Sequence, residues 1–141
     1  MLLIKNGRVI DPARKTDAPL DVLLDGEKIT DLAPTGKISP NGAQIFDATG
    51  LIVAPGFIDL HAHLREPGQE SSETIETGTR AAARGGFTAV CCMPNTKPVN
   101  DSASVTRFIL DRAKSAASVR VWPIGAASVS SKVKLSRKSP P

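Results

Sequence analysis

Apolar and polar positions in the first 54 residues recur in short alternating runs that are typical of β-strands. Residues 2–10 and 20–32 fit strands, and the second range alternates around Asp25-Gly26, a dipeptide favoured in two-residue hairpins. A further apolar stretch, residues 44–53, follows a loop rich in proline and glycine. The pattern therefore predicts a small antiparallel β unit over residues 1–54.

After Pro55-Gly56 the pattern changes, and apolar runs alternate with segments of helical periodicity. A first helix is expected over residues 73–84, with Ser72 as N-cap and Gly85-Gly86 at its end, and Asp101 or Ser102 can cap a second. Strands are expected over residues 57–63, 87–93 and 119–124. Because this alternation is typical of parallel βαβ units, residues 55–128 are predicted to form part of an α/β fold.

The composition indicates the class of protein and the cellular location to expect. Hydrophobic residues make up 40% of the 141 residues, which is enough for the core of an ordinary domain. No apolar run approaches the roughly 20 residues that cross a bilayer, and the N-terminus lacks the pattern of a secretory signal. Cys91 and Cys92 are adjacent, which argues against a disulfide framework. We therefore expect a cytoplasmic location and no membrane partner.

The net charge of +4 belongs to the C-terminal tail. Residues 132–138 hold four of the 18 basic residues and no acidic one, whereas the first 131 residues are neutral overall. No basic patch with interleaved aromatic residues occurs elsewhere, so no nucleic-acid partner is expected. The tail, residues 129–141, lacks apolar periodicity and is predicted to be disordered.

The chain has two histidines, His61 and His63, and both lie at the end of the first strand after the change of pattern. Because strand side chains alternate faces, Phe57, Asp59, His61 and His63 should share one side, with the apolar residues between them packed under helices on the other. At the C-terminal end of a β/α-barrel strand, two such imidazoles can hold one divalent cation, with zinc the favoured ion. Asp59 could then orient an imidazole. The alternative is a pair of merely polar histidines on an edge strand, since H-x-H alone is short.

A longer stretch around these histidines resembles a known enzyme family. Residues 56–68 read GFIDLHAHLREPG, and residues 92–98 read CMPNTKP. The first is similar to the first barrel strand of dihydroorotases in the amidohydrolase superfamily, and the second to the loop after their second strand. H-x-H is shared with hydantoinases, allantoinases and ureases, whereas HLREPG combined with MPNTxP is specific to dihydroorotases. The likeness spans residues 1–131, because the N-terminal β unit resembles the family's small composite β-sandwich.

This resemblance implies the N-terminal part of a metal-dependent (β/α)8 amidohydrolase barrel, preceded by the small antiparallel β-sandwich unit. A complete barrel of this type takes roughly 250 residues. We therefore expect an incomplete barrel that is inactive alone. None of the family's catalytic residues is expected in the chain, because the proton-shuttling aspartate and the further metal ligands would lie on later strands.

The resemblance also implies roles for individual residues. His61 and His63 match the family's first two ligands for one or two zinc ions, and His63, Leu64, Arg65 and Asn95 match its substrate-binding positions. The chemistry agrees, since Arg65 offers a planar fork that suits a carboxylate and Asn95 supplies amide donors from a proline-flanked loop. A surface salt bridge for Arg65 and a turn role for Asn95 are the alternatives. Glu66, Glu70 and Glu73 are expected to solvate a loop or to favour a helix start, as three acidic residues without a role as bases.

The implied activity is the reversible conversion of N-carbamoyl-L-aspartate to (S)-dihydroorotate in pyrimidine biosynthesis. Zinc would activate water and polarise the ring carbonyl, and a carboxylate would pass the proton to the leaving nitrogen. The expected ligand is thus a small molecule. Aspartate transcarbamoylase or further copies of the chain are possible protein partners.

Two other functions stay open from the sequence. One is a related cyclic amidohydrolase, either an allantoinase or a dihydropyrimidinase-like enzyme. The other is a non-catalytic dihydroorotase-like partner of aspartate transcarbamoylase, although such chains tend to lose the zinc histidines that are intact here. The basic tail suggests a frameshift, since one added base after the Lys132 codon can restore an amphipathic helix start. A native basic tail is the competing explanation.

Overall fold

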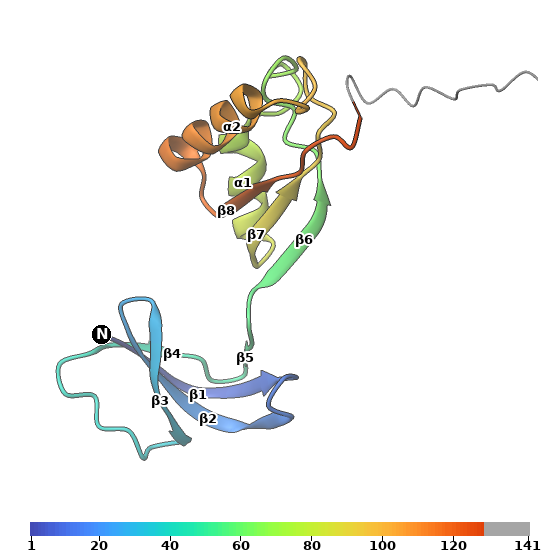
Figure 1. The fold of residues 1–141 in the computed structure, drawn as a ribbon. Coiled ribbons are helices and arrows are strands. Elements are labelled where there is room, and N and C mark those ends of the chain that lie inside the picture. The colour runs from blue at the N-terminus through green and yellow to red at the C-terminus, as the bar shows by residue number, and fades with distance from the viewer. Residues whose placement is uncertain (129–141) are drawn as a thin grey trace, which may run out of the picture. The chain divides into compact units, whose positions relative to one another are not determined.

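The computed structural model describes residues 1–128 of the chain, so the predictions of a disordered tail and of a frameshift lie outside the described residues. The described residues divide into two compact units, Met1–Pro55 and Gly56 onward, and each has its own sheet (Figure 1). This division lies one residue after the boundary that the sequence suggests. The two units are described separately below.

The first unit is a five-stranded sheet in which β1 is central. Its strands are β1 (Leu2–Asp11), β2 (Thr16–Asp25), β3 (Lys28–Pro34), β4 (Gln44–Asp47) and β5 (Ile52–Val53). The strands β1, β2 and β3 are antiparallel neighbours, and Gly26 has a φ of +56° in the predicted hairpin turn.

The expectation of an antiparallel unit holds for β1, β2 and β3 but is wrong for β4 and β5. Both β4 and β5 pair with β1 in parallel, so that the first unit forms one mixed sheet. The physical reason lies in the loop between β3 and β4, which returns the chain to the start of β1. There the backbone N–H of Gln44 donates to the carbonyl of Met1 at 3.1 Å, and β4 then runs in the same direction as β1.

The second unit consists of parallel βαβ units, as the sequence predicts. Its elements are β6 (Phe57–Ala62), α1 (Ile75–Arg84), β7 (Phe87–Cys92), α2 (Ala103–Ala116) and β8 (Arg120–Pro123). The strand order is β6-β7-β8, and both pairings are parallel. This mixed α/β arrangement agrees with the predicted fold class at that level.

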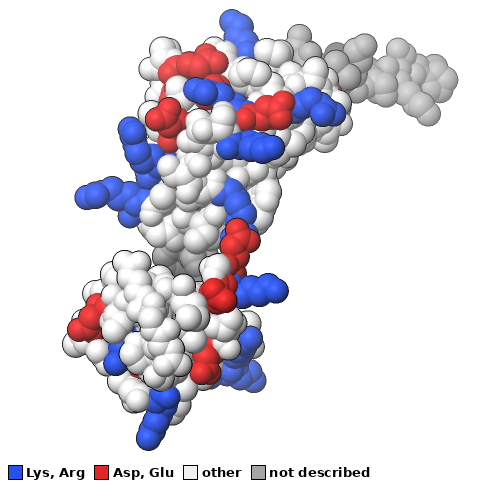
Figure 2. Space-filling view, turned by 90° about the vertical axis from the view of Figure 1, so that its left-hand side faces the viewer, with Lys and Arg blue, Asp and Glu red and all other residues white. Residues whose placement is uncertain are grey.

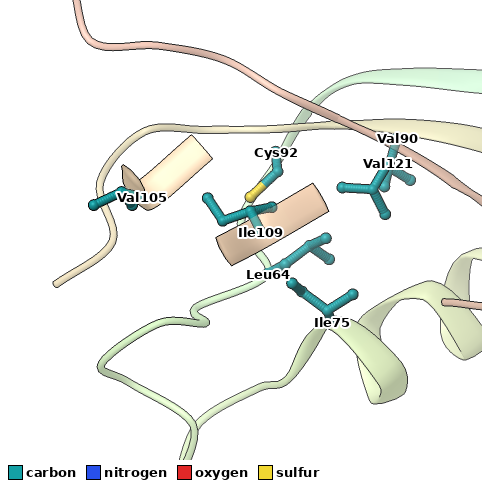
Figure 3. Close-up of a cluster of buried hydrophobic side chains, with 7 residues drawn as sticks. All are labelled: Leu64, Ile75, Val90, Cys92, Val105, Ile109 and Val121. Atoms are coloured by element: carbon teal, nitrogen blue, oxygen red, sulfur yellow. The ribbon is translucent and has the colours of Figure 1, made fainter. Parts of the chain in front are cut away.

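The core of the second unit lies between the sheet and the two helices, since α1 packs on β7 and α2 on β8. Figure 3 shows side chains from strand, turn and helix converging there. Its buried members are Leu64, Ile75, Val90, Cys92, Val105, Ile109 and Val121. The turn after β6 and the end of β7 therefore share one hydrophobic cluster, which fixes both strand ends.

The helix starts differ in detail from the prediction. Helix α1 begins at Ile75, and Thr74 is its N-cap in place of the predicted Ser72. Thr74 and Thr77 form a reciprocal capping box, in which the Thr74 hydroxyl accepts from the Thr77 N–H at 3.1 Å. Gly85 ends the helix as expected. At α2, Ser102 is the N-cap residue, but its side chain makes no capping hydrogen bond.

Strand β6 does not keep the strict alternation expected from its sequence. Its register against β7 shifts between Phe57 and Ile58 and again between Asp59 and Ala62. Ala62 packs against the core as predicted, but Ile58 and Leu60 are 49% and 71% exposed, so the expectation that they lie under helices is wrong. The reason is that the described helices pack on β7 and β8, whereas β6 lies at the edge of the sheet.

Charged side chains of both signs lie intermingled on the face of the molecule shown in Figure 2. Asp17 and Arg8 form a salt bridge of 2.7 Å on the first unit, and the hydrogen bond from Arg8 lowers the pKa of Asp17. Neither α1 nor α2, the helices of residues 1–128, is long and apolar enough to span a bilayer.

Candidate functional site

His61 and His63 lie together at the C-terminal end of β6. His61 is in the strand, which ends at Ala62, and His63 begins the turn that follows. Both side chains are exposed, and their ring centroids are 5.2 Å apart in an edge-on arrangement. Two imidazoles on one tetrahedral zinc, with Zn–N bonds of about 2 Å, place their ring centroids about 5 Å apart. The observed separation therefore fits two ligands of one ion.

Asp59 contacts the backbone near the histidines. Its Oδ1 accepts a hydrogen bond from the N–H of His61 at 2.9 Å. The carboxylate thus orients the main chain at His61, whereas the sequence suggests that it orients an imidazole. The expectation of a carboxylate–imidazole contact is replaced by this backbone contact in the structure.

Asn95, from the loop after β7, meets His63 from the turn after β6. Asn95 Oδ1 and His63 Nδ1 are 2.8 Å apart, which is a hydrogen-bond distance. The ladder between the strands continues up to this point, because the N–H of Met93 donates to the carbonyl of Ala62 at 2.8 Å. The structure therefore brings together two predicted site residues that are 32 positions apart in the chain.

Arg65 occupies a strained turn. Its φ is +61°, and the N–H of Glu66 donates to the carbonyl of Leu64 at 2.8 Å across it. A three-residue turn with positive φ at its centre is rare and strained. Both neighbours of Arg65 are buried, at 3% exposure for Leu64 and 5% for Glu66, whereas Arg65 itself is partly exposed. The turn therefore sends two side chains inward and keeps the guanidinium accessible.

Leu64, one of the predicted substrate-binding residues, has a buried side chain. Its side chain is buried in the core with Ile75 and Val90 (Figure 3). Because apolar packing occupies this side chain, it does not face a ligand, and only its backbone could do so. The signal in the sequence was the alternation that places Leu64 on the apolar side.

Gln69 links Arg65 to the loop that carries Asn95. Its Nε2 donates to the backbone carbonyl of Asn95 at 3.3 Å, and its Oε1 accepts from Arg65 Nη1 at 3.5 Å. The bond from Arg65 is long and uses one of five guanidinium N–H donors. Donors of Arg65 therefore stay available for a carboxylate.

Gly68 and Lys97 hold the two loops against each other. The N–H of Lys97 donates to the carbonyl of Pro67 at 2.9 Å. Gly68 has a φ of +95°, and a Cβ at this position would overlap the backbone oxygen of Lys97. This close approach requires glycine, so the Gly of the HLREPG motif has a structural reason.

The buried side chain of Glu66 connects the turn to both helices, a role that the sequence only partly indicates. Its Oε2 accepts from the N–H of Ile75, at the start of α1, at 2.9 Å, and its Oε1 accepts from Arg112 Nε, on α2, at 2.7 Å. The carboxylate raises the pKa of Arg112 by hydrogen bonding and by its charge. Glu66 thus favours a helix start as expected, but it is buried instead of solvating a loop.

Glu70 and Glu73, the other two glutamates considered in the sequence, make local hydrogen bonds. Glu70 Oε1 accepts from the N–H of Gly68 at 2.7 Å, and this backbone hydrogen bond lowers the pKa of Glu70. The carboxylate of Glu73 accepts from the hydroxyl of Thr77 in the first turn of α1. Both contacts agree with the expected roles in the loop and at the helix start.

Asn100, for which no sequence pattern predicts a role, connects the loop after β7 to the end of β8. It is fully buried, its Nδ2 donates to the carbonyl of Ile124 at 2.9 Å, and its Oδ1 accepts from the Thr106 hydroxyl at 2.7 Å. Its N–H donates to the carbonyl of Pro94 at 2.9 Å, directly beside Asn95. A buried, fully used amide of this kind rigidifies its surroundings.

The donor set fits part of a metal site. Two exposed imidazoles with the observed separation suit zinc, whose protein sites use about three or four ligands. Residues 1–128 hold no group of three or more His, Cys, Asp or Glu side chains that could bind a metal. Cys91 and Cys92 are strand residues of β7, and burial raises the pKa of the Cys92 thiol. A complete zinc site would therefore need ligands from beyond the described residues.

Comparison with known proteins gives a consistent result. Residues 50–135 match the family model described as dihydro-orotase-like. The chain is 62% identical over 125 residues to the dihydroorotase of Solibacter usitatus (strain Ellin6076), covering 89% of this chain and 29% of the relative. It is 55% identical over 131 residues to the dihydroorotase of Geobacter sulfurreducens (strain ATCC 51573 / DSM 12127 / PCA), covering 93% and 31%. The chain spans about three tenths of the length of these curated relatives.

Solved structures share the fold. The L-hydantoinase (dihydropyrimidinase) from Arthrobacter aurescens superposes with a TM-score of 0.77 at 23% identity, covering 88% of this chain and 27% of that one. The D-hydantoinase from Bacillus sp. AR9 gives a TM-score of 0.73 at 33% identity, covering 87% and 26%. The arrangement of the described elements is thus found in larger enzymes whose names denote hydrolysis of cyclic amides.

Proposed function

The chain belongs to the dihydro-orotase-like family, and from this premise we propose that it contributes part of the active site of a zinc-dependent dihydroorotase. The reaction would be the reversible conversion of N-carbamoyl-L-aspartate to (S)-dihydroorotate. One observation carries the proposal, the 2.8 Å contact between His63 and Asn95. It joins the histidine pair suited to a metal ion to an amide suited to binding a substrate carboxylate. These groups lie at the ends of neighbouring parallel strands, where barrel enzymes place their sites.

The metal part of the site is proposed from the histidine pair. His61 and His63 would hold zinc, and the remaining ligands would come from residues outside those described. Zinc, when bound, lowers the pKa of water and polarises a carbonyl. The role of the backbone contact from Asp59 would be to keep His61 in its orientation.

The substrate part of the site is proposed from Arg65 and Asn95. Arg65 would receive the substrate carboxylate on its planar fork, and Asn95 Nδ2 would add a donor. The strained turn at Arg65 and the contact of Gln69 with both residues would keep these donors in place. The substrate is then held at the strand ends, which brings its reacting carbonyl near the histidines. The proton shuttle would be supplied by a residue beyond those described.

The related cyclic amidohydrolases are the main competing candidates. The solved structures named as hydantoinases support the reaction class, but their identity of 23% and 33% is far below the 62% to a dihydroorotase. Dihydroorotate carries a carboxylate that dihydrouracil lacks, and Arg65 with Asn95 supplies the matching donors. The intact His61 and His63 disfavour a non-catalytic partner of aspartate transcarbamoylase. Assembly with that enzyme, self-association and a cytoplasmic location stay predictions.

The test is an assay of the complete gene product on dihydroorotate and on dihydrouracil, with Arg65→Gln as the variant. Loss of a hydrogen bond to a charged group costs about 1.5–3 kcal/mol, so kcat/KM for dihydroorotate should fall by at least about tenfold. Activity on dihydrouracil should be low in both proteins and unchanged by the substitution. A preference of the unaltered protein for dihydrouracil would instead establish the hydantoinase-like alternative.

A further inference from the structure

The contact between His63 and Asn95 pairs a ring nitrogen with an amide oxygen. The atom of Asn95 that faces the ring is the amide oxygen Oδ1, at 2.8 Å from His63 Nδ1. An amide oxygen accepts hydrogen bonds and cannot donate them. A hydrogen bond at this contact therefore requires the proton to be on Nδ1.

A neutral imidazole that is protonated at Nδ1 has its lone pair at Nε2. We infer that Asn95 is a positioning residue that fixes His63 in the tautomer in which Nε2 can bind a metal. In metal sites, a histidine usually donates its other N–H to a carboxylate or a carbonyl, which sets its tautomer and ring orientation. Here the side-chain amide of Asn95, from the loop after β7, would take that part.

Asn95 is itself held in place by the loop around it. Its backbone carbonyl accepts from Gln69 Nε2 at 3.3 Å, and the preceding Pro94 accepts from the N–H of the buried Asn100 at 2.9 Å. These contacts involve the backbone of the loop, so they leave the Asn95 side chain for His63. A positioning role requires a fixed partner, and this loop provides one.

The arrangement gives Asn95 two uses at once. Its Oδ1 accepts from His63, and the Nδ2 donors stay available for the substrate carboxylate that the proposed function assigns to this loop. That second use, and the relevance of the tautomer to catalysis, rest on the proposed function. The tautomer itself does not, and it can be measured without substrate or metal.

The experiment is a two-bond proton–nitrogen NMR correlation on the imidazoles of the full, nitrogen-15-labelled chain at a pH where both rings are neutral. The unaltered chain should show His63 protonated at Nδ1. Asn95→Ala should produce a mixture of tautomers, and a zinc titration should show its affinity at His63 reduced by about tenfold or more. Asn95→Asp keeps an acceptor at this position, so it should preserve both the tautomer and the zinc affinity.

Two controls keep the inference falsifiable. Glu70→Ala removes an exposed carboxylate of the loop after β6 whose hydrogen bond goes to the N–H of Gly68, so the His63 tautomer should stay as in the unaltered chain. Backbone amide spectra report whether each variant is folded. His63 protonated at Nε2 in the unaltered chain, or a tautomer unchanged in a folded Asn95→Ala variant, would overturn the inference. Failure of the proposed function would be seen differently, as Nδ1 protonation with no dihydroorotate turnover by the complete gene product.

Discussion

Strands β6 and β7 are parallel neighbours of equal length, yet they differ sharply in burial. In β7, Ala89, Val90 and Cys92 are buried, whereas in β6 the large apolar residues are exposed. Phe57, Ile58 and Leu60 reach exposures of 64%, 49% and 71%. The central strand β7 has a strand on each side and helix α1 packed on it, and β6 is an edge strand of the described sheet.

The comparison shows that stability and candidate chemistry are divided between the two strands. β7 carries the core and delivers Asn95 through a loop fixed by buried Asn100. β6 and the turn after it carry the exposed His61 and His63, and the buried residues, Leu64 and Glu66, come after the end of the strand. Substitutions in the core under β7 should therefore change unfolding, and those on β6 should change binding.

The largest expected effect is that of Ile109→Ala, which removes a fully buried side chain of α2 from the core cluster that also holds Val90 and Cys92 of β7. Such truncations cost about 2–5 kcal/mol of unfolding free energy. The matched change on β6, Leu60→Ala, removes an exposed side chain and should stay within about 0.5 kcal/mol. Denaturant unfolding followed by circular dichroism measures both. Equal losses at the two positions would refute the division.

Gly68→Ala should be next, because it forces apart the loops that follow β6 and β7. Gly86→Ala is the control, since Gly86 also has positive φ, at +83°, but a Cβ there meets nothing closer than 3.7 Å. A left-handed conformation alone costs a residue with a Cβ about 1–2 kcal/mol. Gly68→Ala should exceed that cost through the overlap with Lys97 and should shift the Asn95 amide signals in NMR. A smaller loss than in Gly86→Ala would count against close loop packing.

Glu66→Ala should have an intermediate effect of about 1–3 kcal/mol, the cost of leaving the buried N–H of Ile75 unpaired. It removes the acceptor for the Ile75 N–H and for Arg112. Glu70→Ala, a change of an exposed carboxylate in the same loop, should be nearly neutral. Thermal unfolding distinguishes the two, and an equal response would show that the buried contacts of Glu66 contribute nothing particular.

The smallest effect concerns the two faces of β7 at Cys91 and Cys92. Cys91 is partly exposed, whereas Cys92 is buried and its pKa is raised by that burial. The thiolate is the reactive form, so at neutral pH iodoacetamide should modify Cys91 several-fold faster than Cys92. Peptide mass spectrometry after timed alkylation reports the two rates. Preferential modification of Cys92 would contradict the burial assigned to this face.

Local patterns predicted much of this architecture. The Asp25-Gly26 hairpin, the parallel βαβ order and the end of α1 at Gly85 each follow from nearby residues, and each is present. The position of the histidines at a strand end also follows from the pattern around His61. These features depend on short-range propensities that a single sequence displays.

The remaining features depend on partners far away in the chain. The parallel pairing of β4 with β1 is set by the course of a loop, and the burial of Glu66 is set by Arg112, 46 positions later. Asn95 meets His63 because two strand ends come side by side, which spacing alone does not reveal. The exposure of Leu60 likewise reflects which strands the helices cover.

The most direct test of the central claim, that the ends of β6 and β7 form one site, is a zinc titration of the labelled chain by NMR. The account predicts that the ring signals of His61 and His63 and the side-chain amide of Asn95 respond together, with a single affinity and one ion. Separate saturation of the two histidines, or an Asn95 amide that does not respond, would contradict it.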